Sequence, residues 1–374
     1  MVDYFATVAR GLESLAAQEL QALGAQQVTE TFTGVHFAGD RELLYKVNLW
    51  TRFIFRVLMP IAEFPCHNAQ QLYQGVQQID WRDYLSPEDT LAVHCTGKNR
   101  QLNHSHYTAL QVKNAIADQQ RQQIGKRSSV DRDSPDLSLN LHLHGNSAVL
   151  SLDSSGDSLH RRGYRPAMGL APLKETLAAA LIDLSEWHPE TPFLDPLCGS
   201  GTLPIEAALK ALQIAPGLLR EEFAFQRWRD FEPQVWQRVK AEAQAQQQTQ
   251  LPASIWGCDR NADILQHAKT NAQNCGIVKQ IHWQTQEFSQ LYPPCESGIL
   301  LCNPPYGKRV GEVEDLAPFY KLMGDVLKQR FTGWTAYILT GNKALAKKIG
   351  LKTSQRIPIY NGSIPCILSK YELY

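Results

Sequence analysis

The stretch FLDPLCGSGT, residues 193–202, decides the fold of the second half of this 374-residue chain. A short apolar run ends at an aspartate, two glycines follow, and a helical pattern continues from Leu203 to Leu212. Apolar runs and helical patterns then keep alternating along the chain, which predicts a parallel sheet with helices on its faces. The expected strands are residues 192–195, 255–259, 281–285, 298–302 and 335–340.

The end of the chain has a different pattern. Two strand-like runs, residues 351–360 and 364–374, are joined by Asn361-Gly362, a dipeptide typical of hairpin turns. We therefore expect an α/β, Rossmann-like sheet that closes with an antiparallel C-terminal hairpin.

The first half of the chain is expected to form separate domains. Residues 1–64 follow the order βαββαβ, which predicts a ferredoxin-like α+β domain. Residues 65–160 make a second α/β segment, and residues 161–374 make the third domain. A Gln-rich insert, residues 214–250, separates the first two strands of the predicted parallel sheet, and its sequence does not indicate a role.

The composition excludes several classes of protein. No apolar run approaches the roughly 18 residues of a membrane span. No secretory signal is visible and the cysteines lack zinc spacing, so we expect a cytoplasmic protein without a metal site. The net charge is zero, but ten Lys or Arg stand against six Asp or Glu between His94 and Arg165, a weak local footprint for nucleic acid.

The glycine-rich loop is expected to hold a cofactor. Gly199 and Gly201 would let a ligand approach the backbone at the sheet edge where Rossmann-like folds bind ligands. Asp195 would repel a pyrophosphate but suits a cationic amino group and a sulfonium, which favours S-adenosylmethionine over NAD or ATP. Asp259 ends the next strand, where its carboxylate either accepts ribose hydroxyls or caps the following helix. Glu287 either contacts an adenine amino group or is a solvated loop acid.

The tetrapeptide NPPY, residues 303–306, follows the fourth predicted strand and is expected to perform the chemistry. Its prolines lack N–H donors, so the carbonyls of the turn should face outward, unpaired. The Asn303 side-chain oxygen and the Pro304 carbonyl would accept the two N–H bonds of an aromatic amine such as adenine N6 or guanine N2, while Tyr306 stacks on the base. A plain exit from strand to loop is the alternative, because Asn-Pro often starts a turn.

These motifs resemble a known family. The order of residues 195–202, Asp259 and residues 303–306 is similar to that of the amino-methyltransferases of the class I fold. Three further signatures resemble the THUMP-domain RNA methyltransferases, most closely the RlmL-type enzymes that methylate guanine N2 in 23S ribosomal RNA. They are residues 153–156, 162–165 and 171–178. Bifunctional members continue into a second methyltransferase domain, so the resemblance implies the stand-alone form here.

The resemblance also implies a role for each motif, with S-adenosylmethionine as cofactor and RNA (23S ribosomal RNA or a ribosome assembly intermediate) as partner. Asn303, Pro304 and Tyr306 would hold the guanine. The implied cofactor contacts are Pro172, Lys174, Asp195, Cys198, Gly199, Ser200, Gly201, Thr202, Asp259, Glu287 and Asn303. The implied RNA contacts are Lys98, Arg100, Arg162 and Arg165. The last two arginines would equally well pack between domains, and Glu287 departs from the Asp that the family often has.

Other functions stay open. A transfer RNA guanine-N2 methyltransferase also has a THUMP module. An adenine-N6 nucleic-acid methyltransferase or a protein glutamine methyltransferase would use the same tetrapeptide, but residues 162–165 argue against these two because in the family they join an RNA-binding module to the catalytic domain. A non-catalytic RNA-binding protein would carry a damaged cofactor loop, whereas Asp195, Gly199 and Gly201 are intact.

Overall fold

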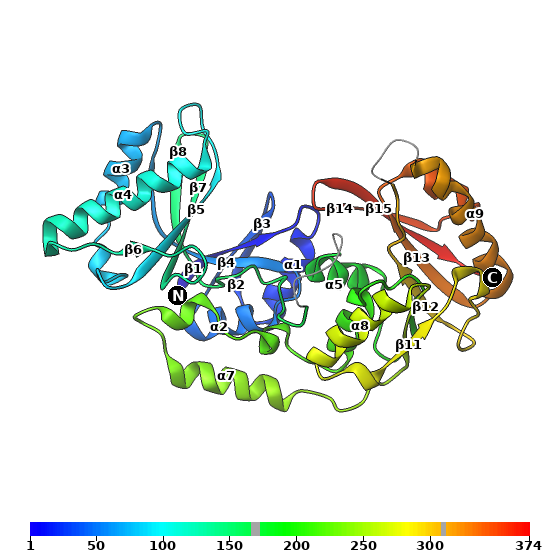
Figure 1. Ribbon diagram of the computed structural model, residues 1–374. Coiled ribbons are helices and arrows are strands. Elements are labelled where there is room, and N and C mark those ends of the chain that lie inside the picture. Colours follow the sequence, from blue (N-terminus) through cyan, green and yellow to red (C-terminus); the bar gives the residue numbers. More distant parts are fainter. Residues whose placement is uncertain (166–172, 308–311) are drawn as a thin grey trace.

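The computed structural model describes residues 1–165, 173–307 and 312–374, and it contains three modules (Figure 1). We call them the N-terminal module (β1 to β4), the second module (α3 to β8) and the C-terminal module (α5 to β15). The N-terminal module lies between the other two.

The N-terminal module has the ferredoxin-like βαββαβ order that its sequence predicts. Its elements are β1 (Val2–Val8), α1 (Glu13–Ala22), β2 (Gln26–Thr31), β3 (Gly34–Gly39), α2 (Arg41–Trp50) and β4 (Ile54–Pro65). β1 is the central strand and pairs antiparallel with β3 and with β4. Helix α2 begins where the Asp40 carboxylate accepts the Leu43 N–H, a side-chain cap that satisfies a free donor of the first turn.

The second module continues the same sheet. Its elements are α3 (Ala69–Gln77), the 3₁₀ turn η1 (Trp81–Asp83), β5 (Thr90–Gly97), α4 (Ser105–Ile124), β6 (Ser129–Val130), β7 (Leu137–His144) and β8 (Ser147–Asp153). The first part of β4 pairs with β1 and the rest pairs with β8, with a register shift between Pro60 and Ala62. One eight-stranded sheet, in the order β2-β3-β1-β4-β8-β7-β5-β6, therefore joins the two modules.

The C-terminal module contains the predicted parallel sheet. Its strands are β9 (Phe193–Asp195), β10 (Ile255–Asp259), β11 (Ile281–Thr285), β12 (Gly298–Cys302), β13 (Trp334–Thr340), β14 (Gln355–Asn361) and β15 (Ile364–Glu372). Its helices are α5 (Glu175–Leu184), α6 (Thr202–Ala211), α7 (Pro233–Ala245), α8 (Ala262–Asn274), α9 (Glu312–Arg330) and α10 (Lys343–Lys348), with 3₁₀ turns η2 (Pro216–Leu219), η3 (Ala224–Arg227), η4 (Val278–Gln280) and η5 (Phe288–Gln290). The sheet order is β11-β10-β9-β12-β13-β15-β14. Only β15 runs opposite to the other strands, so it pairs antiparallel with both β13 and β14, as the hairpin signal predicts.

The insert of residues 214–250 folds back onto the N-terminal module. Tyr45 of α2 stacks on Phe225 with ring centroids 4.5 Å apart, and the Trp236 ring of α7 meets it edge-on at 6.1 Å. The Tyr45 hydroxyl also accepts the Glu232 N–H at 3.0 Å. The role that the insert's sequence does not indicate is therefore structural: its aromatic side chains pack the C-terminal module against α2.

A membrane-spanning segment and a metal site both find no support in the described part of the chain. Within it, no helix combines the length and apolar character needed to cross a membrane. The same residues hold no group of three or more His, Cys, Asp or Glu side chains placed to bind a metal ion.

Candidate active site

The parallel sheet changes its winding direction next to β9. Strands β10 and β11 lie on one side of β9, whereas β12 and β13 lie on the other. Ligands of doubly wound sheets bind at such a point, outside the carboxyl ends of the strands. Asp195 is the last residue of β9, Asp259 is the last of β10, and Asn303 directly follows β12. The structure therefore brings these three residues to one edge of the sheet.

The loop between β9 and α6 is built on its two glycines. Gly201 caps α6 with φ +84°, and a Cβ there would lie 2.9 Å from the Ala268 Cβ, so only glycine fits against α8. Gly199 also has positive φ, but no atom lies within 4 Å of the position its Cβ would take. The loop is anchored by the Cys198 N–H, which donates to the Cys258 carbonyl at 2.8 Å. Open space at Gly199 leaves room for a ligand against the backbone.

Two acidic side chains lie beside this open space without a neutralising cation. Asp195 is 2% exposed and accepts one hydrogen bond, from the Leu197 N–H at 3.1 Å. Burial raises the pKa of Asp195 well above its usual range, and the nearby charge of Asp259 raises it further. Among the described residues, no Lys or Arg pairs with either carboxylate. A ligand with a positive charge would relieve this repulsion, so the residues fit a cationic cofactor.

Asp259 ties the loop to the next strand. Its Oδ2 accepts the Gly199 N–H at 3.0 Å, and its Oδ1 accepts the Asn261 N–H at 2.9 Å. The cap of α8 is Asn261, whose side chain accepts the N–H groups of Asp263 and Ile264. The alternative that Asp259 caps this helix is therefore wrong. Each Asp259 oxygen keeps a lone pair for a further donor.

The tetrapeptide at residues 303–306 contains a buried acceptor without a partner. The Asn303 Oδ1 atom is buried and has no hydrogen-bond partner among the described residues. Leaving a buried acceptor unpaired costs on the order of 1–3 kcal/mol. Groups of this kind in a folded protein call for a specific explanation, and one is a ligand that donates to them. At the winding change of the sheet, Asn303 is placed to accept an N–H from a substrate.

Two tyrosines fix the rest of the turn. The hydroxyl of Tyr320, a fully buried residue of α9, donates to the Pro305 carbonyl at 3.1 Å. The expectation that all carbonyls of the turn are unpaired is therefore wrong at Pro305. The Tyr306 hydroxyl accepts from Asn361 Nδ2 at 2.7 Å, and burial raises the pKa of this phenol, which keeps it neutral. The Tyr306 ring also lies against Gly341, where a Cβ would come within 3.2 Å of it.

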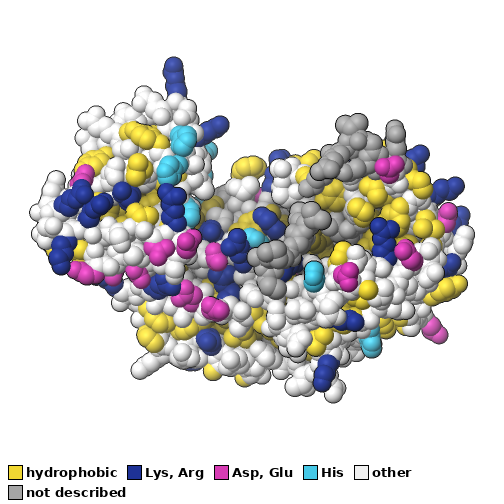
Figure 2. All heavy atoms as spheres, in the orientation of Figure 1, with side chains coloured by type: hydrophobic (Ala, Val, Ile, Leu, Met, Phe, Trp, Pro, Cys, Tyr) yellow, Lys and Arg dark blue, Asp and Glu magenta, His cyan; other side chains and the backbone are white. Residues whose placement is uncertain are grey.

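A second polar site is a cleft of about 830 Å³ where the three modules meet. Figure 2 shows this face of the molecule hollowed beside the second module, with Lys and Arg side chains around the hollow. The basic residues that line the cleft are Arg56, Arg132, Arg161, Arg162, Arg165, Lys174, Arg220 and Arg227. Burial, together with the charges of Lys174 and Arg161, lowers the pKa of His160 in this cleft to about 4. Acidic residues also line the cleft: Asp133, Asp157, Glu175, Glu221 and Glu222. Eight basic residues against five acidic ones leave a modest positive excess, which suits phosphate.

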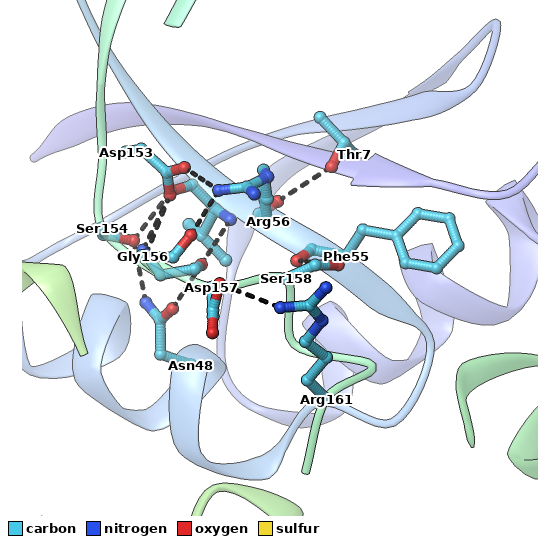
Figure 3. Close-up of polar contacts among 12 residues, drawn as sticks. Thr7, Asn48, Phe55, Arg56, Asp153, Ser154, Gly156, Asp157, Ser158 and Arg161 are labelled. Carbon is cyan, nitrogen blue, oxygen red and sulfur yellow. Dashed lines mark hydrogen bonds and ion pairs between the residues drawn. The ribbon is translucent and has the colours of Figure 1, made fainter. Parts of the chain in front are cut away.

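The basic residues of the cleft differ in whether their side chains already have a charged or polar partner within the protein. Figure 3 shows Arg56 directed at Asp153 and at the Gly156 carbonyl, so its charge is largely used within the protein. Arg161 is 68% exposed, and its contact with Asp157 at 3.6 Å is also exposed. Exposed pairs of this kind stabilise little, by about 0–1 kcal/mol, so Arg161 is available to a ligand.

Comparison with known proteins identifies the family. The model of the RMKL-like methyltransferase domain matches residues 162–370. The chain belongs to the RMKL-like methyltransferase family. Models of the RlmL ferredoxin-like domain and of the THUMP domain match residues 3–58 and 66–153, so the fold is a class I methyltransferase sheet preceded by ferredoxin-like and THUMP modules.

Curated relatives span the whole chain. The Synechocystis sp. protein slr0064, which carries the name of an RNA methyltransferase, is 58% identical over 99% of this chain and 97% of its own length. The ribosomal RNA large subunit methyltransferase K/L of Syntrophotalea carbinolica is 41% identical over 100% of this chain. This chain spans 54% of the length of that second relative.

Two solved structures have the same fold over the whole chain. The methyltransferase SMU.472 in complex with S-adenosylhomocysteine is 31% identical, with a TM-score of 0.89, and the match covers 100% of this chain and 98% of that one. A Listeria monocytogenes protein described as an N6-adenine-specific DNA methylase is also 31% identical, with a TM-score of 0.87 and 100% and 96% coverage. The bound product in SMU.472, together with the family, makes S-adenosylmethionine the cofactor of this RMKL-like protein.

The signature at residues 162–165 has a structural role. Arg162 is 1% exposed and donates to the carbonyls of Thr51, Leu159 and Arg52, with Glu206 3.6 Å from its Nε. The prediction that Arg162 touches RNA is therefore wrong, because its guanidinium is enclosed between the N-terminal and C-terminal modules. Arg165 pairs with Glu175 at 3.4 Å and donates to the Thr202 hydroxyl, which also directs it inward.

Four of the other predicted RNA and cofactor contacts are exposed, and a fifth lies outside the described residues. Lys98 and Arg100 are exposed at the end of β5, and Glu287 is exposed at the start of η5. Lys174 is exposed, and its ammonium lies 5.0 Å from the centre of the Phe55 ring. Pro172 lies outside the described residues.

Sequence reasoning missed two side chains of the site. Tyr320 lies in a helical pattern where an aromatic residue indicates only a core position, and Asn361 was interpreted only as a turn residue. The single signal available was that Asn361 sits in the hairpin of the catalytic domain. Their contacts join residues 15 and 55 positions apart in the chain, which no local pattern reveals.

Proposed function

We propose that this methyltransferase transfers a methyl group to the N2 amino group of a guanine in 23S ribosomal RNA. The observation that supports this most strongly is the buried, unpartnered Asn303 Oδ1 at the winding change of the sheet, next to the open cofactor loop. An acceptor in that place requires a donor on the substrate, and an exocyclic amine is such a donor.

In this proposal the protein acts by positioning. An aromatic amine is a poor nucleophile because its lone pair is delocalised into the ring. Asn303 Oδ1 and the Pro304 carbonyl accept its two N–H bonds, which directs the lone pair away from the ring and stabilises the developing positive charge. The Tyr306 ring, fixed by Asn361, stacks on the base after it leaves its helix. The cofactor would supply an electrophilic methyl group: the N2 lone pair forms the new C–N bond while the methyl–sulfur bond breaks, which leaves S-adenosylhomocysteine. The cation formed on the base then loses its proton to solvent.

The cofactor contacts follow from the open loop. Asp195 accepts the cationic amino group, and Asp259 accepts a ribose hydroxyl with its remaining lone pairs. The loop residues Cys198, Gly199, Ser200, Gly201 and Thr202 approach through the backbone, with Gly199 leaving the space. Glu287 is exposed just after strand β11, and we assign it to the adenine amino group of the cofactor. Lys174 is also exposed, and we assign it to the solvent-facing side of the cofactor.

RNA is proposed as the polymer because of the basic cleft and the relatives' names. Exposed Arg161 and Arg132 in the cleft, with Lys98 and Arg100 on the second module, are placed to contact phosphates. One relative is named as an RNA methyltransferase, and another as a large-subunit ribosomal RNA methyltransferase. Guanine rather than adenine rests on the family resemblance, and the Listeria protein's description makes adenine N6 the alternative to test.

The test is nucleoside analysis of RNA after reaction. Purified protein and labelled S-adenosylmethionine are incubated with transcripts of 23S ribosomal RNA, 16S ribosomal RNA and transfer RNA, and with large-subunit assembly intermediates. We expect N2-methylguanosine at one position of 23S RNA, either naked or in the intermediate. Methyl transfer only to transfer RNA, or formation of N6-methyladenosine, would replace this proposal with one of its alternatives.

A further inference from the structure

One exposed aromatic side chain has no structural explanation in the fold. Phe32 lies at the turn between β2 and β3, and 76% of its surface is exposed. Apart from the two chain termini, no large apolar side chain in the described residues is more exposed. A single exposed aromatic residue is common on protein surfaces, so its meaning depends on the groups beside it.

An arginine connects Phe32 to the C-terminal module. The Arg10 guanidinium lies 5.7 Å from the centre of the Phe32 ring and 4.6 Å from the centre of the Tyr360 ring. Among the described residues its guanidinium makes no ion pair and no hydrogen bond, so both its charge and its donors stay available. We call Arg10, Phe32 and Tyr360 the aromatic–arginine stack.

The stack lies against the hairpin that carries Asn361. Tyr360 immediately precedes Asn361, the residue that donates to the Tyr306 hydroxyl. The loop that carries Arg10 also approaches β14, since a Cβ on Gly11 would lie 4.0 Å from the Pro358 carbonyl. The N-terminal module thus places two stacking groups beside the hairpin that fixes the base-stacking tyrosine.

We infer that the aromatic–arginine stack holds the nucleotide adjacent to the methylated one, with its base against Phe32 and Arg10. This inference rests on the proposed function, because extruding a target base leaves its neighbour without a stacking partner. Aromatic rings and guanidinium planes are the groups on which unpaired RNA bases stack. The free donors of Arg10 would reach the phosphate between the two nucleotides. The N-terminal module would then contribute to target selection directly.

Phe32→Ala tests the inference, with Phe32→Trp as a rescue variant. Loss of one base stack should raise the KM for RNA about 5- to 100-fold while kcat and the cofactor Kd stay within about 2-fold. Phe32→Trp should restore the KM and Phe32→Leu should not, because only a flat ring stacks. Arg10→Gln should raise the KM and also reduce its dependence on salt.

The chain offers a matched control. Tyr292 is 65% exposed and carries Arg330 4.4 Å above its ring, but that stack belongs to the loop after β11 and not to the hairpin at Tyr306. Tyr292→Ala should leave the KM for RNA unchanged. A second readout uses RNA with fluorescent 2-aminopurine next to the target guanine: binding should quench it in the wild type and in Tyr292→Ala, but not in Phe32→Ala.

The outcomes separate this inference from the proposed function. If the wild type methylates RNA and Phe32→Ala matches Tyr292→Ala in KM and quenching, the stack has no role with the neighbouring base and the inference is wrong. If Phe32→Ala is impaired only on assembly intermediates and not on naked RNA, the stack contacts a ribosomal protein, which also overturns it. If the wild type methylates no RNA at all, the proposed function itself fails.

Discussion

Two sets of charged residues in this protein look alike in sequence and differ in the structure. The linker network of Arg162, Arg165, Glu175 and Glu206 is buried, and its cations are matched by acids or backbone carbonyls. At the sheet edge, the like charges of Asp195 and Asp259 lie together with no cation among the described residues, beside the unpartnered Asn303 oxygen. The linker network also holds buried atoms without a hydrogen-bond partner (Arg162 Nε, Arg165 Nε and Glu206 Oε2), so the difference lies in the charges. Like charges left together without a cation indicate a ligand site, whereas opposite charges that neutralise each other indicate architecture.

The sharpest test of this comparison is at Asn303. Asn303→Ala removes the unpartnered acceptor, and we expect kcat to fall about 10³-fold, as when a preorganised hydrogen-bonding group is lost from an active site. Cofactor affinity, measured by calorimetric titration, should stay within a few-fold because Asn303 acts on the amine. An equal loss of activity and of cofactor affinity would place Asn303 in the cofactor site instead.

The matching experiment in the linker concerns stability. Arg162→Ala leaves Glu206 buried without its cation, and loss of one partner from a buried pair costs about 3–5 kcal/mol. Thermal or denaturant unfolding should report that loss. The neighbouring Arg161→Ala is the control, because the Arg161 side chain is 68% exposed. This variant should keep the wild-type stability but bind RNA more weakly. The slope of log binding constant against log salt concentration should decrease in magnitude by about 0.7–0.9. The reverse pattern would make Arg162 the RNA contact.

A third effect concerns pH and Asp195. In the free protein, burial and Asp259 raise the pKa of Asp195, so the carboxyl is partly protonated in acid solution. A cationic amino group favours the ionised form, so binding releases a proton and affinity should increase as pH rises toward neutrality. Calorimetry in two buffers of different ionisation enthalpy would detect the released proton.

Asp195→Asn should weaken cofactor binding about 10- to 100-fold at neutral pH, the value of a hydrogen bond to a charged group. The same variant should lose the pH dependence, since no carboxyl remains to titrate. Retention of the wild-type pH profile in this variant would show that another group carries the titration.

The smallest effect is expected at Asn361. Asn361→Ala removes the donor to the Tyr306 hydroxyl, a net hydrogen bond of about 0.5–1.5 kcal/mol, so kcat/KM for RNA should fall about 2- to 10-fold. Tyr306→Phe should give a similar loss, and the double variant should be no worse than either single one. Additive losses in this cycle would mean that the two side chains act independently.

Much of the fold follows from local patterns. The expected strands at residues 255–259, 281–285 and 298–302 agree with β10, β11 and β12, because each is a short apolar run between helical patterns. The positions of Asp195, Asp259 and Asn303 at strand ends follow from the same patterns. The helices α5, α7 and α10 were not predicted: α5 begins within the signature at residues 171–178, α7 lies in a Gln-rich insert, and α10 has only six residues.

By itself, the sequence determined the parallel sheet with its hairpin, the ferredoxin-like order and the residues at the cofactor edge, because strand and helix periods and turn residues are local properties. Only the tertiary structure decided which arginines are buried and that β4 joins two modules in one sheet. It also decided that Tyr320 and Asn361 contact the turn at residues 303–306 and that Arg10 lies over Phe32 and Tyr360. These features depend on contacts between residues far apart in the chain. Packing determines whether a charged side chain contacts a partner within the protein or stays available to a ligand. The spacing of residues along the chain does not reveal this.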